Sequence, residues 1–160
     1  MSKLYVDEIR PKTSGKHVIM PENPAWSVKM SSGAYVALGV TPVIFDVAEI
    51  NRGGAYNTST GVVTIPQSGV YNITAMAYVR IDAGEDAAVR IMKSTNGGSS
   101  YDLQTYAYHY PVGATQIQTT LTNNILLDLN EGDNLRVDIT GNADYYSGSG
   151  ETRFSGFLVG

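Results

Sequence analysis

The sequence alternates between short runs of β-branched and aromatic residues and clusters of turn-forming residues, and this pattern most constrains the fold. The connections carry Gly, Asn, Asp, Pro and Ser, as in "GGAYNTSTG" and "TNGGSSY". No stretch has the period of an amphipathic helix, and "DVAEIN" (46–51) is too short for a helix of consequence. The pattern predicts an all-β sandwich or barrel. The expected strands are 4–10, 25–30, 43–47, 61–65, 70–81, 87–94, 101–110, 115–129, 134–140 and 152–159.

The strand expected at 70–81 has two different faces. Its apolar face consists of Tyr71, Ile73, Ala75, Ala77, Val79 and Ile81. The other face is mixed and includes the bulky Met76 and Tyr78. A strand that is apolar inward and semi-apolar outward is typical of a sandwich whose outer surface is partly covered by another subunit. We therefore expect Met76 and Tyr78 at a subunit interface.

The last strand gives the same indication. In "TRFSGFLV" one face carries Phe154, Gly156 and Leu158, and the other carries Ser155, Phe157 and Val159. Because both faces are apolar, we place Phe157 in the subunit interface as well.

Composition excludes several function classes. The length of 160 residues suits one domain, and a net charge of −4 argues against a nucleic-acid partner, which requires a basic face. The absence of cysteine excludes disulfides and cysteine-based zinc sites. Charges interrupt the first 24 residues every few positions, so we expect neither a secretory signal nor membrane insertion. The sequence predicts a protein made in a cytoplasm.

A composition shift near Pro21 and Pro24 divides the chain. Upstream lies a short charged segment, and downstream lies the β-rich part. We therefore expect an extended N-terminal arm at 1–23 and one globular β-domain at 24–160.

Residues that could carry chemistry are sparse. There is no Gly-x-Ser-x-Gly elbow, and His17 and His109 are far apart, so we interpret both as ordinary histidines. The acidic turn "DAGED" (82–86) is expected to be solvated, with a calcium site as the alternative. A glycan hydrolase that uses separated carboxylates is a further alternative. The sequence predicts no enzyme and no cofactor.

Tyrosines are the most suggestive polar-aromatic residues. Tyr106, Tyr108 and Tyr110 share one face of an expected strand, and tyrosine suits both sugar stacking and protein interfaces. The alternative is that this stripe packs in the core or in a subunit seam. Tyr145 and Tyr146 lie in the Gly/Ser-rich "NADYYSGSGE", which we expect to be a receptor-facing loop, with structural packing of the loop as the alternative.

Several of these segments together resemble the globular-head domain of complement component 1q, which belongs with the tumour necrosis factor fold. The resemblance covers "PAWSVKM", the long stretch from Val43 to Ala75, "LNEGDNLRV" and "FSGFLV". The matching residues are Ala25, Trp26, Ser27, Val43, Phe45, Asn51, Gly53, Tyr56, Asn57, Thr60, Gly61, Thr64, Pro66, Gly69, Tyr71, Gly132, Asp133, Phe154, Gly156 and Phe157. Trp26 and Ile73 stand where the family commonly has Phe.

This resemblance implies a ten-stranded jelly-roll sandwich that forms a compact homotrimer and works by binding rather than catalysis. It also implies that Tyr71 and Phe157 fill the sandwich core.

The N-terminal "MSKLYVDEIRPKTSGKHVIMP" resembles the start of many structural proteins of tailed bacteriophages. The matching residues are Leu4, Val6, Asp7, Ile9, Thr13, Ser14 and Gly15. This resemblance implies a virion protein that is anchored to other virion proteins through Leu4, Val6 and Ile9. The expected function is that of a trimeric fibre or tail-tip adhesin that binds a host-surface glycan or protein. The alternative is a purely structural capsid decoration, fibre or tail connector protein.

Overall fold

The computed structural model describes residues 23–31, 33–37, 39, 42–113, 115–148 and 150–159. Within these residues the chain forms strands and no helix, which confirms the all-β prediction. The strand expected at 4–10, the predicted arm up to residue 22 and the anchor residues Leu4, Val6 and Ile9 lie outside the described residues.

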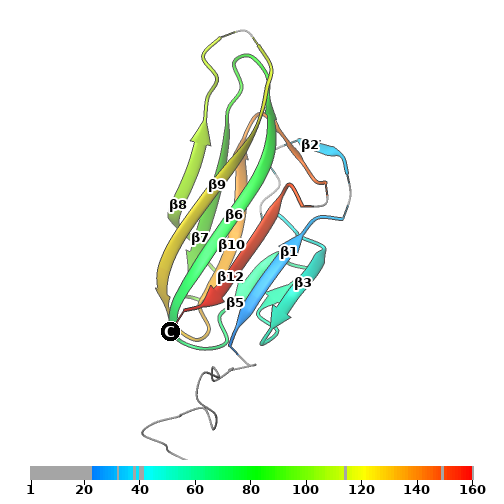
Figure 1. The fold of residues 1–160 in the computed structure, drawn as a ribbon. Helices are drawn as coiled ribbons and strands as arrows, with labels where there is room; N and C mark the ends of the chain where they lie inside the picture. Colours follow the sequence, from blue (N-terminus) through cyan, green and yellow to red (C-terminus); the bar gives the residue numbers. More distant parts are fainter. Residues whose placement is uncertain are drawn as a thin grey trace, which may run out of the picture.

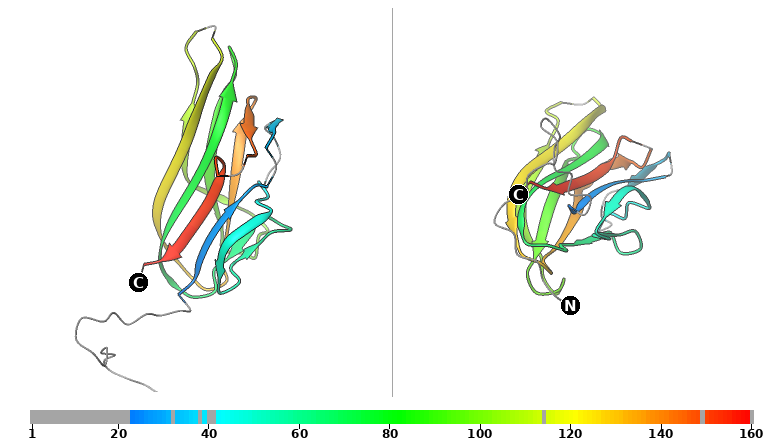
Figure 2. Two further views of the ribbon diagram at one scale, coloured as in Figure 1. Left: turned by 45° about the vertical axis from the view of Figure 1, so that its right-hand side comes forward. Right: turned by 60° about the horizontal axis from the view of Figure 1, so that its bottom comes forward.

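The strands form two antiparallel sheets packed face to face (Figure 1). Sheet A contains β1 (Ala25–Lys29), β2 (Tyr35–Ala37), β3 (Val47–Arg52), β6 (Gly69–Ile81), β9 (Ile117–Leu129), β11 (Asp144–Tyr146) and β12 (Arg153–Leu158). Sheet B contains β4 (Tyr56–Asn57), β5 (Val62–Thr64), β7 (Ala87–Ser94), β8 (Asp102–His109) and β10 (Asn134–Gly141). Strand β9 forms one edge of sheet A and β8 forms one edge of sheet B, as the further views in Figure 2 show.

The strand directions give the sandwich two distinct ends. Strand β1 begins where β12 ends, and the Leu158 N–H donates a hydrogen bond to the Pro24 carbonyl at 3.0 Å. We call this the proximal end. At the opposite, distal end, the turn at 82–86 meets the turn after β10, since the Asn142 N–H donates to the Asp86 carbonyl at 3.2 Å. The side chain of Gln116 donates to Asp82 there at 2.6 Å.

The core follows the alternation that the sequence predicts. All six apolar residues on the predicted inner face of 70–81 are fully buried in β6. The proximal half of the core is aromatic, with ring centroids 5.6 to 6.5 Å apart: Trp26, Phe45, Tyr56, Tyr71 and Phe154. Tyr71 is therefore a core residue, as expected. Phe157 is not, because its neighbours Phe154 and Leu158 have the inward parity of β12 and Phe157 is 52% exposed.

The strand predictions fail where the chain is irregular. Residues 43–46 form no strand, although Val43 and Phe45 are buried and the Val43 N–H donates to Val137 at 2.9 Å. The segment from Val47 onward, which includes most of "DVAEIN", is the edge strand β3. The short strands β2, β4 and β11 were not predicted, because two or three residues give no readable period.

The turn between β3 and β4 is closed by side-chain hydrogen bonds. The Asn51 amide donates to the Tyr56 carbonyl at 2.9 Å and accepts from the Tyr56 N–H at 3.0 Å. Gly53 and Gly54 have φ of 76° and 64°, a left-handed conformation that other residues avoid. The hydroxyl of buried Tyr56 then accepts a hydrogen bond from the Phe45 N–H at 2.8 Å. Asn51, Gly53 and Tyr56 therefore act together in closing this turn.

The burial of Tyr56 predicts a loss of stability in alkali. Burial raises the pKa of Tyr56 from 10.0 to about 12. Between these values the unfolded chain has released this proton and the folded chain has not. The free energy of unfolding should therefore fall by up to about 1.4 kcal/mol per pH unit from this group. We expect a Tyr56→Phe variant, followed by urea denaturation from pH 8 to 12, to show a shallower decline. An unchanged slope would contradict the assignment.

Candidate functional site

The outer face of sheet A has an apolar patch at the proximal end. In register, Leu126 of β9 and Phe157 of β12 flank Asn72 of β6. Leu126 is 58% exposed and Phe157 is 52% exposed. Val70 and Val159 add to this patch, and the Val159 N–H donates to the Val70 carbonyl at 2.7 Å. The patch combines side chains from three neighbouring strands and is not covered by any described residue of the same chain.

The three predicted interface residues lie on this same outer face. Met76 is half-buried and lies opposite Arg153 of β12. Tyr78 is half-buried as well, and its hydroxyl donates to the side chain of Gln118 on β9 at 2.8 Å. Together with Phe157 these side chains extend along β6 and β12, so the structure brings the predicted residues to one surface.

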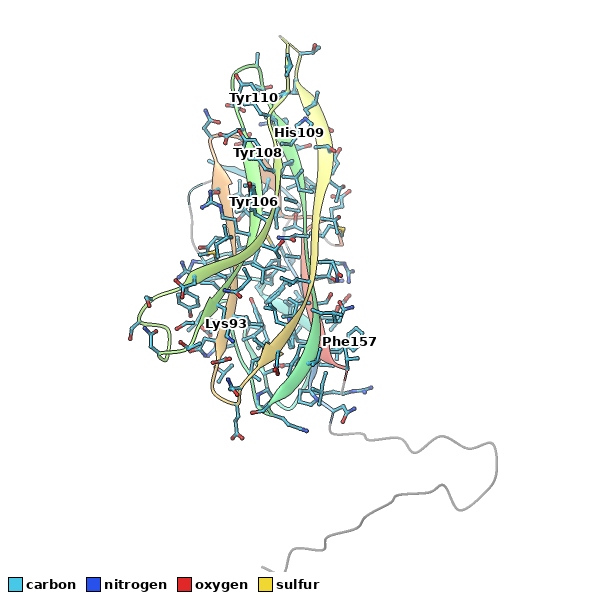
Figure 3. The ribbon with its side chains drawn as sticks, turned by 90° about the vertical axis from the view of Figure 1, so that its left-hand side faces the viewer. Lys93, Tyr106, Tyr108, His109, Tyr110 and Phe157 are labelled. Atoms are coloured by element: carbon cyan, nitrogen blue, oxygen red, sulfur yellow. The ribbon has the colours of Figure 1, made fainter. Side chains whose placement is uncertain are left out.

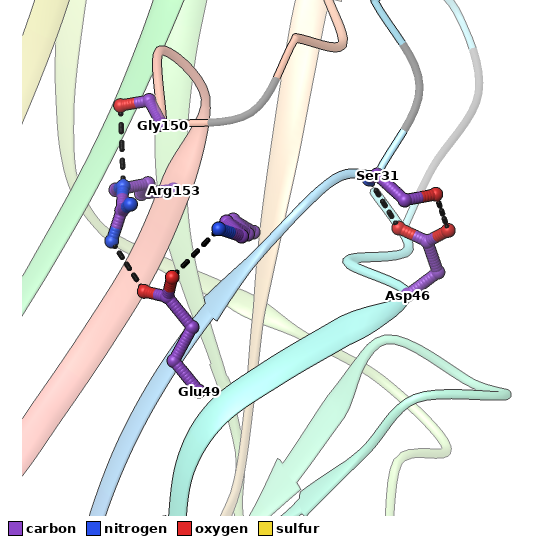
Figure 4. A network of polar contacts seen from close by, with 6 residues as sticks. Ser31, Asp46, Glu49, Gly150 and Arg153 are labelled. Carbon is purple, nitrogen blue, oxygen red and sulfur yellow. Dashed lines mark hydrogen bonds and ion pairs between the residues drawn. The ribbon is translucent and has the colours of Figure 1, made fainter.

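A network of ion pairs holds the middle of this face (Figure 4). The Glu49 carboxylate pairs with Lys29 of β1 at 2.7 Å and with Arg153 of β12 at 2.7 Å. The Arg153 Nε also donates to the Gly150 carbonyl at 3.2 Å. Hydrogen bonds from Lys29, then from Arg153, lower the pKa of Glu49. The network crosses three strands and fixes their polar side chains in place.

A tyrosine cluster occupies the distal part of the same face. The Arg80 guanidinium lies 4.2 Å from the centroid of the Tyr35 ring and pairs with Asp144. The Tyr146 ring lies 5.1 Å from Tyr35 and 6.3 Å from Tyr78, between centroids. A Cβ added at Gly148 would meet the Tyr146 ring at 1.9 Å, so the ring fills space that only glycine leaves open. Tyr146 is thus a half-buried member of a packed cluster.

The prediction of a receptor-facing loop is wrong for Tyr145. This residue is only 4% exposed and is part of the hydrophobic core. Its segment is the strand β11, which pairs with both β2 and β6. Adjacent residues of a strand point to opposite sides, so Tyr145 points inward while Tyr146 points outward. Two consecutive tyrosines in one short strand could have signalled this division. A receptor-facing role for Tyr146 stays a prediction.

The tyrosine stripe lies on the outer face of sheet B. Tyr106, Tyr108 and Tyr110 are 59%, 52% and 52% exposed, so packing in the core of the single chain is wrong. Figure 3 shows them in a row along β8 toward the distal end. Tyr106 and Tyr108 line a groove of about 370 Å³ together with Leu103 and Arg90. The sequence did not single out Arg90 and Leu103, because only the pairing of β7 with β8 brings them to the tyrosines.

The described residues contain no cluster of three or more His, Asp or Glu side chains positioned to hold a metal ion. In the acidic turn at 82–86 one carboxylate forms a hydrogen bond within the turn, since the Asp82 N–H donates to the Glu85 carboxylate at 2.9 Å. In the part of the chain that the structure describes, no helix is long and apolar enough to span a membrane.

A known protein family matches nearly the whole β-sandwich. The profile of the C1q domain matches residues 25–159, which is most of the chain. The chain belongs to the C1q domain family. This assignment accounts for the jelly-roll sandwich, and the family consists of ligand-binding or structural domains rather than enzymes.

Solved structures support the fold at low sequence identity. The Eiger TNF of S. frugiperda is 12% identical, with a TM-score of 0.70 over 87% of this chain and 94% of that chain. The globular domain of zebrafish complement 1qA is 17% identical, with a TM-score of 0.64 over 86% and 98%. Murine APRIL is 14% identical, with a TM-score of 0.64 over 86% and 99%. These similarities establish a shared fold with the C1q and TNF domains.

Proposed function

We propose that this C1q domain is a homotrimeric virion protein of a bacteriophage that acts as a fibre or tail-tip adhesin. The observation that carries the proposal is the uncovered outer face of sheet A. Leu126, Phe157 and Val159 each leave more than half of their surface exposed in the single chain. Exposed apolar patches of this kind mark protein interfaces, and domains of this family typically form trimers. A stable trimer would bury on the order of 2,000 Å² or more.

The two ends of the sandwich support an attachment role. The chain enters β1 at the proximal end, and the segment before it carries the bacteriophage-like pattern with Leu4, Val6 and Ile9. This segment would anchor each protomer to other virion proteins. The distal turns would then face away from the particle. Three copies on one axis would multiply weak contacts with a host-surface glycan or protein.

Adsorption to cells tests the proposal. Fluorescently labelled protein should adsorb to a subset of a bacterial panel, and isolated surface polysaccharide of those cells should compete. A monomeric variant should adsorb at least about tenfold more weakly, because it loses multivalent attachment. A trimer that adsorbs to no cell would favour the alternative of a decoration, fibre or connector protein. Release of reducing sugar from the polysaccharide would overturn the non-enzymatic assignment.

A further inference from the structure

We propose that the groove on the outer face of sheet B binds a carboxylated sugar, such as a uronic acid residue of a surface polysaccharide. We call it the β7–β8 groove, and its lining residues are Arg90, Leu103, Tyr106 and Tyr108. The inference rests on the proposed adhesin function and assigns the ligand class and the site.

The tyrosines give the groove a stacking surface. Tyr106 and Tyr108 lie two residues apart on β8, and Tyr110 follows directly after the end of the strand, so the stripe is roughly 13 Å long at about 3.3 Å per residue. Each ring is more than half exposed, and Leu103 is 47% exposed beside them. Tyrosine rings contact the apolar C–H side of a pyranose and their hydroxyls hydrogen-bond to its polar edge. A flat ligand extended along β8 fits this row.

Arg90 adds a positive charge without a partner. It lies directly opposite Tyr106 in the β7–β8 register. Among the described residues its guanidinium forms no hydrogen bond or ion pair, and its Nε is buried without a partner. Asp138 lies directly opposite Arg90 on β10; its Oδ2 pairs with Arg136 at 2.9 Å, and its buried Oδ1 has no hydrogen-bond partner among the described residues. One buried carboxylate thus faces two arginines, which leaves an excess of positive charge beside the stacking rings and favours a carboxylate on the ligand.

Nearby charges orient such a ligand. Asp86 lies near Tyr108: desolvation of the phenol, then the negative charge of Asp86 and a hydrogen bond with its side chain, raise the pKa of Tyr108. The Asp86 carboxylate repels an anion at the distal end of the groove, whereas Arg90 attracts one beside Tyr106. The carboxylate of the sugar should lie over the Arg90–Tyr106 pair.

The β7–β8 groove lies on the outer face of sheet B, whereas the apolar patch lies on the outer face of sheet A. An assembly through sheet A would leave three copies of the groove on its outside, one per protomer. The same tyrosines would instead be buried if the stripe belonged to the subunit seam. The oligomeric state of the groove variants separates these two arrangements.

Calorimetric titration with trigalacturonate and its carboxyl-reduced trisaccharide tests the groove. The wild-type protein should bind the acidic sugar about tenfold more tightly than the neutral one. The Arg90→Gln variant should lose this preference, and Tyr106→Ser should weaken both sugars. Arg52→Gln, which removes an exposed arginine on β3, is the matched control and should bind as the wild type does.

Four outcomes would overturn the proposal: no saturable binding of trigalacturonate, equal binding of both sugars, unchanged binding by Arg90→Gln, or dissociation of the assembly by Tyr106→Ser. Equal or better binding of a polyglutamate peptide would also overturn it in favour of an acidic protein partner.

Adsorption of these variants to cells distinguishes the two proposals. If the wild type and Arg90→Gln adsorb equally, adhesion stands and the groove assignment fails. If trigalacturonate binds but no cell is adsorbed, the groove stands and the adhesin role fails.

Discussion

Replacing Phe157 with glutamate is expected to convert a trimer of about 52 kDa into single chains of 17.2 kDa. The reason is the position of Phe157 in the apolar patch of sheet A, beside Leu126 and Val70. In an assembled trimer this side chain would be desolvated, and a buried carboxylate without a partner is costly enough to prevent association. In the single chain the position is 52% exposed, so the variant should still fold.

Light scattering at several micromolar concentrations measures this effect, and circular dichroism checks that the β-structure remains. The matched control is Leu103→Glu, which makes the same type of change at a residue that is 47% exposed on sheet B. This control should keep the mass of the trimer. A wild-type chain that is already monomeric would contradict the trimer proposal. A Phe157→Glu protein that remains trimeric would exclude Phe157 from the seam.

Replacing Gly156 with alanine should destabilise the fold by about 3 kcal/mol or more. A Cβ at this position would lie 2.3 Å from Cζ2 of Trp26 and 2.5 Å from its Cη2. Trp26 cannot easily move away, because it is 1% exposed and its ring packs against Tyr71 and Phe154 at centroid distances of 6.1 and 5.6 Å. The glycine therefore provides the space that the indole fills.

Urea denaturation at a fixed protein concentration measures the change, since association itself contributes to stability. Ser155→Ala, the neighbouring change on the outward side of β12, should shift the free energy of unfolding by less than about 0.5 kcal/mol. Trp26→Phe combined with Gly156→Ala should cost less than the sum of the single changes, because phenylalanine vacates the contested space. Additive costs, or a stable Gly156→Ala protein, would contradict this packing account.

The turn residues that match the C1q family could be interpreted from the sequence, because each one interacts with residues of its own turn or sets a local backbone angle. Asn51 closes its turn by hydrogen bonds to Tyr56, and Gly61 tolerates a φ of 73° where a Cβ would lie 2.6 Å from the Val43 carbonyl oxygen. A turn hydrogen bond or a positive φ requires a particular residue type at a particular position, and such a requirement is visible in a short stretch of sequence. The long strands β6, β7, β8 and β9 were predicted almost to their bounds for the same reason, since eight or more residues show the period of two.

The sequence by itself determined the all-β class, the inward face of β6 and the outward position of Met76 and Tyr78, because alternation is a property of the strand alone. Only the tertiary structure decided where single aromatic residues lie. Tyr145 lies in the core because β11 pairs with β6 in a register that turns this residue inward. For Phe157 the sequence had left two placements, the core and the subunit interface, and the structure places it on the outer face of sheet A with 52% of its surface exposed. The β7–β8 groove likewise depends on register, because Arg90 lies beside Tyr106 only when β7 and β8 pair. The positions of these two residues in the sequence do not predict that contact.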